Sequence, residues 1–212
     1  MGYHRAGFDV VGVDIKPMPN YPFTFIEGDA MAFMRGLDPY SHGYAAIHAS
    51  PPCQAFTAMG SMPNAREHED LLTPTLAWLD SMSTPYVVEN VMGAPMRSAV
   101  RLCGTAFGLM SNVPGRGDVE LRRHRLFETN WPLMVPGCAH KRGRMVVGFY
   151  GDHHARIRRR SADGGDITGT EEKMRLVKEA MGIDWMTWSE ANQSFPPAYT
   201  EYIGKQLLAV LA

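Results

Sequence analysis

Two short apolar segments, each ending in polar residues, constrain the fold of this 212-residue chain more than any other feature. Residues 44–49 have the pattern of a buried strand. Pro51 and Pro52 stop it, because proline continues neither a sheet ladder nor a helix. Residues 86–90 have the same apolar pattern, and a stretch with helical spacing lies between the two. The order strand, helix, strand predicts a βαβ unit with parallel strands and a right-handed crossover.

Cys53 and Glu89 lie at the carboxyl ends of these two strands. Open α/β sheets place their chemistry at that edge, so we expect both side chains to share one crevice. Taken alone, Cys53 is as compatible with a buried structural thiol as with a nucleophile, because free cysteine is among the most buried residue types. The residues that accompany Cys53 therefore decide between the two interpretations.

The rest of the chain continues the alternation of strands and helices. Residues 8–15 are nearly continuously apolar, which is typical of a parallel strand covered on both faces. We expect further strands at residues 23–26, 121–128 and 145–150, and helices at residues 30–37, at residues 171–181 and from Tyr199 onward. In the strand at 121–128, Arg123 and Arg125 would share one face. These elements predict an α/β fold with a doubly wound, mostly parallel sheet.

Three helix starts carry capping signals. Thr73 and Pro74 fit an N-cap followed by proline at the first helical position, at the start of the helix between the two opening strands. Asp29 precedes the helix at 30–37 as a cap. Thr187 and Glu190 fit a capping box, in which each side chain bonds to the backbone of the other residue.

Length and cysteine content limit the class of protein. A chain of 212 residues suits one domain with a small additional lobe, and three cysteines argue against a disulfide framework. The N-terminus has neither the apolar run of a signal peptide nor a myristoylation pattern. No apolar stretch approaches the roughly 20 residues of a membrane span. We therefore expect a cytosolic, monomeric protein that does not bind membranes.

The near-neutral net charge of −1 hides a basic segment. Residues 116–160 contain 11 lysines and arginines against 4 acidic residues, a net +7, so the remainder carries −8. Such a cluster indicates a polyanionic partner, most simply a nucleic acid, although a solvated charged surface would have the same composition.

The other two cysteines have ordinary interpretations. Cys103 lies in a compact, glycine-punctuated run and is expected in the core. Cys138 and His140 are too few for a zinc site, which needs four ligands, so we expect a loop thiol and a surface histidine. On this basis no metal is expected.

Taken in order, the chemically active residues resemble the DNA (cytosine-5)-methyltransferases. The matching stretches are Ser50-Pro51-Pro52-Cys53-Gln54, Glu89-Asn90-Val91, Leu102-Cys103-Gly104 through Phe107-Gly108-Leu109, Arg123-His124-Arg125, and Pro196-Pro197-Ala198-Tyr199 through Ile203-Gly204. They follow the order in which that family carries its motifs, and they extend over nearly the whole chain. Leu121 departs from the pattern, because many relatives carry glutamine before the arginine pair, and this puts one polar contact in doubt.

The resemblance implies a covalent mechanism on cytosine. Cys53 would add to carbon 6 of the ring, which makes carbon 5 nucleophilic enough to accept a methyl group. Glu89, with a raised pKa, would protonate or hydrogen-bond ring nitrogen 3, and Arg123 would hold the carbonyl oxygen of the base. Arg125 would support Cys53 and Glu89. Asn90 would brace the loop by hydrogen bonds.

The partner implied is double-stranded DNA, and a base inside a stacked duplex is out of reach. The target cytosine would therefore be flipped into the site. The loop after Cys53, from Gln54 to residue 62, would clamp the base, and Arg122 would contact the DNA. Residues 129–183 fall where the family carries its target-recognition region. This divides the chain into a catalytic core at 1–128, that small basic region, and a segment at 184–212 that returns to the core.

The methyl donor implied is S-adenosylmethionine. By position, Asp14 resembles the acid that binds the donor's ribose, and Asp29 the acid that reads the adenine amino group. Ile15 would pack on the adenine, and Pro51 would line the donor site. The family's first strand and glycine-rich loop have no counterpart, since residues 1–8 match only the helix that follows them. We therefore expect a gap in the sheet and an incomplete pocket for the methionine half of the donor.

Three other functions remain open. An amino-methyltransferase acting on adenine N6 or cytosine N4 would need an aromatic residue where Cys53 stands, and it leaves residues 89–91 unexplained. An RNA cytosine-5 methyltransferase would use the same catalytic set. A truncated, cofactor-deficient remnant of the family would keep its DNA-binding surface without methyl transfer.

Overall fold

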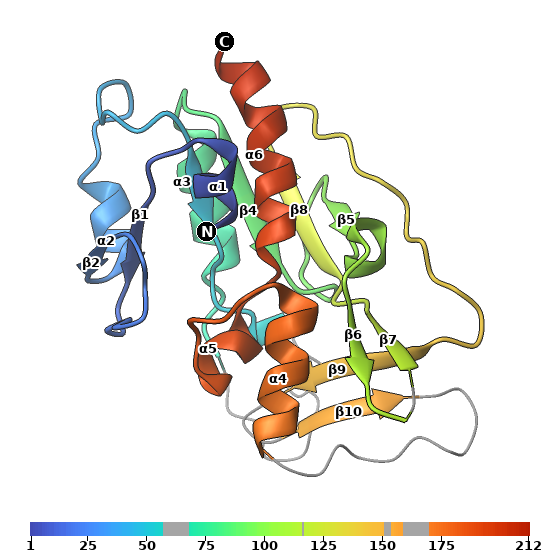
Figure 1. Ribbon diagram of the computed structural model, residues 1–212. Coiled ribbons are helices and arrows are strands. Elements are labelled where there is room, and N and C mark those ends of the chain that lie inside the picture. The colour runs from blue at the N-terminus through green and yellow to red at the C-terminus, as the bar shows by residue number, and fades with distance from the viewer. Residues whose placement is uncertain (57–67, 116, 151–153, 159–169) are drawn as a thin grey trace. The chain divides into compact units, whose positions relative to one another are not determined.

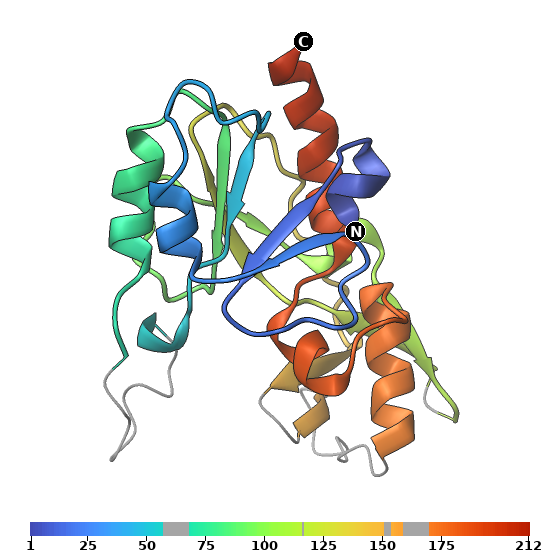
Figure 2. The same cartoon turned by 90° about the vertical axis from the view of Figure 1, so that its left-hand side faces the viewer.

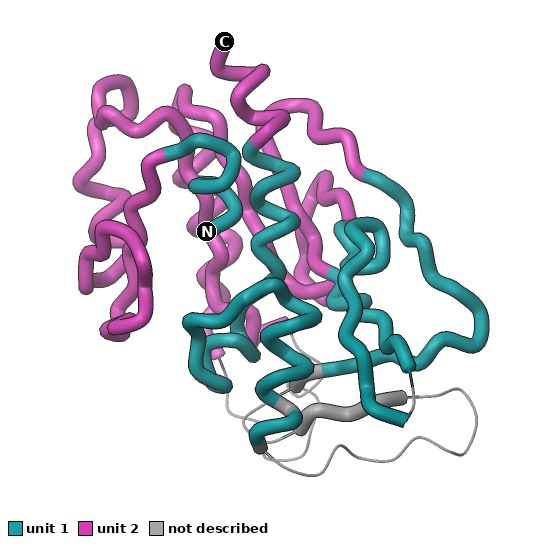
Figure 3. The backbone as a smooth tube through the Cα atoms, in the orientation of Figure 1, with its two compact units in different colours: residues 1–8, 102–124, 136–204 teal, residues 9–101, 125–135, 205–212 magenta. Residues whose placement is uncertain are grey.

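The computed structural model describes residues 1–56, 68–115, 117–150, 154–158 and 170–212, and Figure 1 labels its helices and strands. The chain divides into two compact units (Figure 3). Unit 1 comprises residues 1–8, 102–124 and 136–204, and unit 2 comprises residues 9–101, 125–135 and 205–212. The predicted recognition region at 129–183 falls mainly in unit 1, together with residues 102–124, which the sequence assigns to the core.

Unit 2 contains the predicted βαβ unit. Its larger sheet has the strand order β3-β4-β8-β5, with the bounds β3 Ile47–Ala49, β4 Tyr86–Asn90, β8 Arg125–Thr129 and β5 Val100–Leu102. β3 and β4 are parallel, as predicted, whereas β8 runs antiparallel to β4. Helix α3 (Leu72–Asp80) connects β3 to β4 and lies alongside them (Figure 2), where Leu76 and Leu79 are buried with Val88 of β4.

The remaining strands of unit 2 form a separate parallel pair, β1 (Val11–Asp14) and β2 (Thr24–Glu27). Helix α2 (Ala30–Arg35) follows β2. Parallel pairing is therefore present, but the described strands lie in small sheets and do not form one continuous doubly wound sheet. The fold is mixed α/β.

Unit 1 holds a second four-stranded sheet, of order β10-β9-β7-β6. Its strands are β6 Met110–Val113, β7 Gly117–Leu121, β9 Met145–Tyr150 and β10 His154–Arg158. β7 and β9 are parallel, and the other two pairs are antiparallel. Helix α4 (Thr170–Met181) covers this sheet, with Leu176 and Val177 buried in one cluster with Val119 of β7.

Three further helices complete the described chain. Helix α5 (Trp188–Gln193) begins with the predicted capping box, in which Thr187 and Glu190 bond to each other's backbone. Helix α6 (Pro197–Leu211) begins slightly before its predicted position, and a short helix, α1 (Gly2–Ala6), stands at the other end of the chain. Among the described residues, no helix combines the length and the apolar character that crossing a bilayer requires.

The prediction of Thr73 as the N-cap of α3 is wrong, because the helix begins at Leu72 and its N-cap residue is Leu71. Asp70 Oδ1 accepts hydrogen bonds from the backbone N–H of Leu72 at 2.8 Å and of Thr73 at 3.1 Å. Thr73 lies inside the first turn of the helix and donates its hydroxyl to Asp70 Oδ2 at 2.6 Å. A charged carboxylate is the stronger acceptor for the unpaired N–H groups of a first turn, and these hydrogen bonds lower the pKa of Asp70.

Candidate active site

The loop that carries Cys53 leaves the carboxyl end of β3. Pro51 and Pro52 restrict its backbone just before the cysteine. The carbonyl oxygen of Cys53 accepts a hydrogen bond from the backbone N–H of Phe56 at 2.9 Å, which closes the helical turn Gln54–Phe56. The free Cys53 thiol is half-buried. It is therefore held at the end of a strand and outside the buried core clusters, as a nucleophile requires.

Asn90 fastens this loop to the end of β4. Its side-chain Nδ2 donates to the carbonyl oxygen of Pro51 at 3.1 Å, and its Oδ1 accepts from the backbone N–H of Val91 at 2.9 Å. Asn90 is 1% exposed, and a buried amide with both ends bonded keeps one orientation. The bracing contact expected of Asn90 is present.

Glu89 and Arg125 form an ion pair at the same edge of the sheet. Arg125 Nε lies 3.0 Å from Glu89 Oε1, and the two side chains are only 17% and 9% exposed. The contact arises because β8 is antiparallel to β4, which brings the start of one strand beside the end of the other. A charge-assisted hydrogen bond in so enclosed a place holds the carboxyl group in a defined position.

Arg123 lies in unit 1, where its guanidinium is bound by main-chain carbonyls. Its Nε donates to Ser194 O at 2.7 Å and its Nη2 to Asn192 O at 2.6 Å, at the carboxyl end of α5. The strand predicted at residues 121–128 is interrupted here, because Arg123 adopts a φ of 24° between β7 and β8. Arg123 and Arg125 therefore do not share a strand face, and that prediction is wrong.

This arrangement predicts a structural effect of Arg123. We expect Arg123→Ala to lower the free energy of unfolding by about 2 kcal/mol, since charge-assisted hydrogen bonds to the end of α5 are lost. Arg123→Gly should lose roughly 1 kcal/mol less, because glycine tolerates a positive φ that alanine does not. Urea unfolding measures both. The exposed Arg142→Ala is the control, and an equal effect of Arg142→Ala and Arg123→Ala would refute this role.

Some basic side chains of residues 116–160 have acceptors within the protein. Six of the eleven lysines and arginines in this segment have described side chains, and four of these have acceptors. These four contacts are Arg122 with Glu120 at 3.4 Å, Arg123 with the carbonyls of α5, Arg125 with Glu89, and Arg144 with Asp118 at 3.2 Å. Lys141 and Arg142 are exposed.

Three of the four residues expected at the methyl donor, Asp14, Ile15 and Asp29, lie at or just after the ends of the parallel strands β1 and β2, and the fourth, Pro51, follows β3. Asp14 Oδ1 accepts from the backbone N–H of Lys16 at 2.9 Å, and Asp29 Oδ1 accepts from that of Ala32 at 2.7 Å as the N-cap of α2. Ile15 is 67% exposed. An ionised carboxylate has about four acceptor sites, so each acid can bind a ligand donor in addition to its backbone partner.

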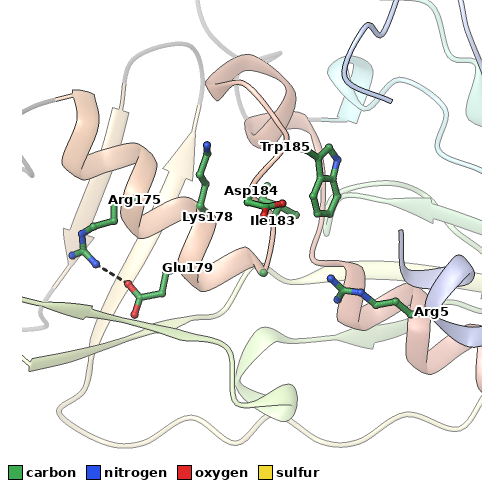
Figure 4. A pocket seen from close by; sticks show the side chains of 8 residues that line it. Arg5, Arg175, Lys178, Glu179, Ile183, Asp184 and Trp185 are labelled. Atoms are coloured by element: carbon green, nitrogen blue, oxygen red, sulfur yellow. Dashed lines mark hydrogen bonds and ion pairs between the residues drawn. The ribbon is translucent and has the colours of Figure 1, made fainter. Parts of the chain in front are cut away.

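The clamp predicted at residues 54–62 lies mostly outside the described residues, which include only its first turn, Gln54–Phe56. A shallow pocket of about 600 Å³ in unit 1 holds none of the predicted site residues (Figure 4). One of its cations, Arg175, pairs with Glu172 and Glu179 at 2.8 Å each. The pocket is therefore separate from the predicted site residues.

His48, in the strand that leads to Cys53, makes the protein sensitive to acid. Desolvation lowers the pKa of His48 from 6.5 to about 4, and its Nε2 lies 3.1 Å from Ser50 Oγ. Below pH 6.5 the His48 side chain is protonated in the unfolded chain but stays neutral in the folded chain. The free energy of unfolding therefore falls as the pH falls from about 6.5 to 4. We expect a loss of about 2 kcal/mol between pH 7 and pH 5 in urea unfolding. His48→Gln should remove most of this difference, and an unchanged difference would contradict the assignment.

The structure also brings together four side chains that the sequence does not connect. They are Cys103, His124, Cys138 and His140, all in unit 1. Cys103 is fully buried, as predicted. The expectation that Cys138 and His140 lack further ligand partners is wrong, because the other two residues come from distant segments. No spacing motif marks such a group in the sequence.

Comparison of the chain with protein-family models and with curated proteins gives no match. The function is therefore inferred from the residues and from the geometry of the site.

Proposed function

We propose that this chain is a DNA (cytosine-5)-methyltransferase with Cys53 as its nucleophile. One observation carries the proposal: the chemically active groups belong to the same edge of one sheet. Cys53 comes after the carboxyl end of β3, and the Glu89–Arg125 ion pair lies at the carboxyl end of the parallel strand β4, where β8 begins. Addition to carbon 6 of cytosine needs a soft nucleophile and a nearby group that stabilises charge on the ring. A half-buried thiol that follows β3, and a carboxyl group held by a guanidinium in the neighbouring strand β4, supply these two groups.

The reaction begins when Cys53, as the thiolate, adds its Sγ to carbon 6 of a flipped cytosine. In its protonated form, the Glu89 carboxyl group donates a proton or a hydrogen bond to ring nitrogen 3, which leaves carbon 5 as the nucleophilic end of an enamine. S-adenosylmethionine supplies the electrophilic methyl group. Loss of the carbon 5 proton to a base then restores the ring double bond and expels the Cys53 thiolate.

The two arginines have different parts in this proposal. Arg125 positions Glu89 through the 3.0 Å ion pair. Only the resemblance assigns Arg123 to the carbonyl oxygen of the base, and the guanidinium N–H groups of Arg123 serve the carbonyls of Ser194 and Asn192. Binding of the base by Arg123 therefore requires those hydrogen bonds to be exchanged.

Asp14, Ile15 and Asp29 fit the adenosine half of the methyl donor. Ribose hydroxyls and the adenine amino group are hydrogen-bond donors suited to the two carboxylates, and the exposed Ile15 side chain offers an apolar surface to the adenine ring.

The proposal is tested by incubating the chain with labelled S-adenosylmethionine and unmethylated DNA of mixed sequence. The DNA is then digested, and the nucleosides are identified by mass spectrometry. We expect 5-methyldeoxycytidine. Label at adenine N6 or cytosine N4 would favour an amino-methyltransferase, and label confined to an added RNA would favour the RNA enzyme.

Calorimetry with S-adenosylmethionine separates activity from donor binding. We expect binding that weakens in an Asp14→Ala variant. If the chain neither binds the donor nor labels any nucleic acid, the catalytic proposal fails, and a DNA-binding remnant is the better description.

A further inference from the structure

Unit 1 contains two thiols and two imidazoles that the proposed reaction does not use. The ligand atoms of Cys103, His124, Cys138 and His140 all lie within 4.8 Å of one another. Cys103 Sγ is 3.2 Å from His140 Nε2, and Cys138 Sγ is 3.5 Å from His124 Nε2. The cluster thus pairs each sulfur with an imidazole nitrogen around a common centre.

We propose that this cluster is a structural zinc site with two thiolate and two imidazole ligands. Zinc binds sulfur at about 2.3 Å and nitrogen at about 2.0 Å, so the ligand atoms of a tetrahedral site lie roughly 3.3 to 3.8 Å apart. The two sulfur–nitrogen distances of 3.2 and 3.5 Å are close to that range. The widest separation, at most 4.8 Å, needs a closure of about 1 Å, which rotation of the less buried side chains can supply.

The ligands come from three segments of the chain. Cys103 directly follows β5 and is fully buried, and His124 lies in the link between β7 and β8. Cys138 and His140 alternate along one loop, with His140 exposed and Cys138 half-buried. Four protein ligands leave no open position on zinc, which is typical of a structural and not a catalytic site.

Backbone and hydroxyl groups already hold the ligands from outside. The backbone N–H of Ala139 donates to Thr105 Oγ1 at 3.2 Å, and Thr105 Oγ1 lies 3.1 Å from Cys103 Sγ. Because that hydroxyl oxygen accepts from Ala139, its own hydrogen is available to the sulfur. The backbone N–H of Lys141 also donates to Glu120 Oε1 at 3.1 Å. Such outer contacts orient metal ligands and stabilise a thiolate.

The position of His124 suggests what the metal does. His124 stands between Arg123 and Arg125, where β7 ends and the chain turns through the positive φ of Arg123. Zinc would tie this link to the loop at residues 136–140, a region of irregular backbone, and so fix the segment that bears the arginines. The site does not depend on the proposed methyl transfer, so either proposal can fail without the other.

The test measures metal in the full, untagged chain purified with a reductant and without a chelator. Inductively coupled plasma mass spectrometry should find about one zinc per chain, and less than about a tenth of that in Cys138→Ala and His140→Ala. Cys53→Ala and His68→Ala, which remove the same residue types outside the cluster, should keep the full amount. Full zinc in the cluster variants would overturn the proposal.

Cobalt substitution keeps the test decisive if those variants fold poorly. Wild-type chain loaded with Co²⁺ should show the intense visible bands of a tetrahedral ion and thiolate-to-metal charge transfer, both abolished by added zinc. Chelation should lower the thermal unfolding midpoint, and zinc should restore it. Wild-type chain that binds neither metal, or that contains a Cys103–Cys138 disulfide under reductant, would refute the zinc site.

Discussion

We expect Cys53→Ala to reduce methyl transfer to DNA by at least about a thousandfold while leaving the fold intact. Without the thiolate, carbon 6 receives no nucleophile and carbon 5 never becomes reactive. The side chain is half-buried on a loop, so its truncation should change the free energy of unfolding by less than about 1 kcal/mol. Initial rates at saturating donor and DNA, with urea unfolding of the same samples, measure the two effects.

Cys53→Ser is the matched variant for this prediction. Serine has nearly the same shape, but its hydroxyl is a much poorer nucleophile at neutral pH than a thiolate. We expect it to be as inactive as the alanine variant and to retain binding to DNA. Activity of either variant within tenfold of wild type would mean that Cys53 is a structural thiol.

The second large effect is expected at Glu89. Glu89→Gln removes the proton donor to ring nitrogen 3, and such a change typically lowers the rate by about a hundredfold to ten-thousandfold. Glu128→Gln is a matched control in the neighbouring strand, because Glu128 is also buried and also pairs with an arginine, accepting from Arg97 Nε at 2.7 Å. Both variants break a carboxylate–guanidinium pair and should cost roughly 1 to 3 kcal/mol of stability.

Methyl transfer should separate the two variants. Rates corrected for the folded fraction should fall in Glu89→Gln and stay within about threefold of wild type in Glu128→Gln. A similar loss in both would indicate that the ion pairs matter only for stability. It would leave the Glu89 carboxyl group without the chemical role assigned to it.

The placement of Cys53, Glu89 and Asn90 follows from local patterns. Apolar runs that end at prolines or polar residues identify strand ends, and parallel pairing makes neighbouring carboxyl ends adjacent. The contact of Arg125 with Glu89 depends on the antiparallel pairing of β8 with β4. The alternation of side chains within a single strand does not show which strand it pairs with. The division of the parallel strands between two sheets could not be predicted either, because strand patterns identify strands but not the partners with which they pair.

The errors have local physical causes. Arg123 was placed on a continuous strand, but a positive φ in a non-glycine residue leaves no signature in the sequence. The Asp70 carboxylate binds the backbone N–H groups of Leu72 and Thr73, and the helix already begins at Leu72, before Thr73 and Pro74. The four residues of the cysteine–histidine cluster come from three separate segments, so they do not form a short sequence motif that would predict the cluster.

Covalent capture tests the central claim most directly. DNA that contains 5-fluorocytosine cannot lose the substituent at carbon 5 after methyl transfer, so the enzyme remains attached to carbon 6. With S-adenosylmethionine present, we predict a denaturation-resistant complex whose peptide map places the DNA on Cys53, and none with Cys53→Ala. An adduct on another residue, or a complex of equal yield with Cys53→Ala, would contradict the assignment of Cys53 as the nucleophile.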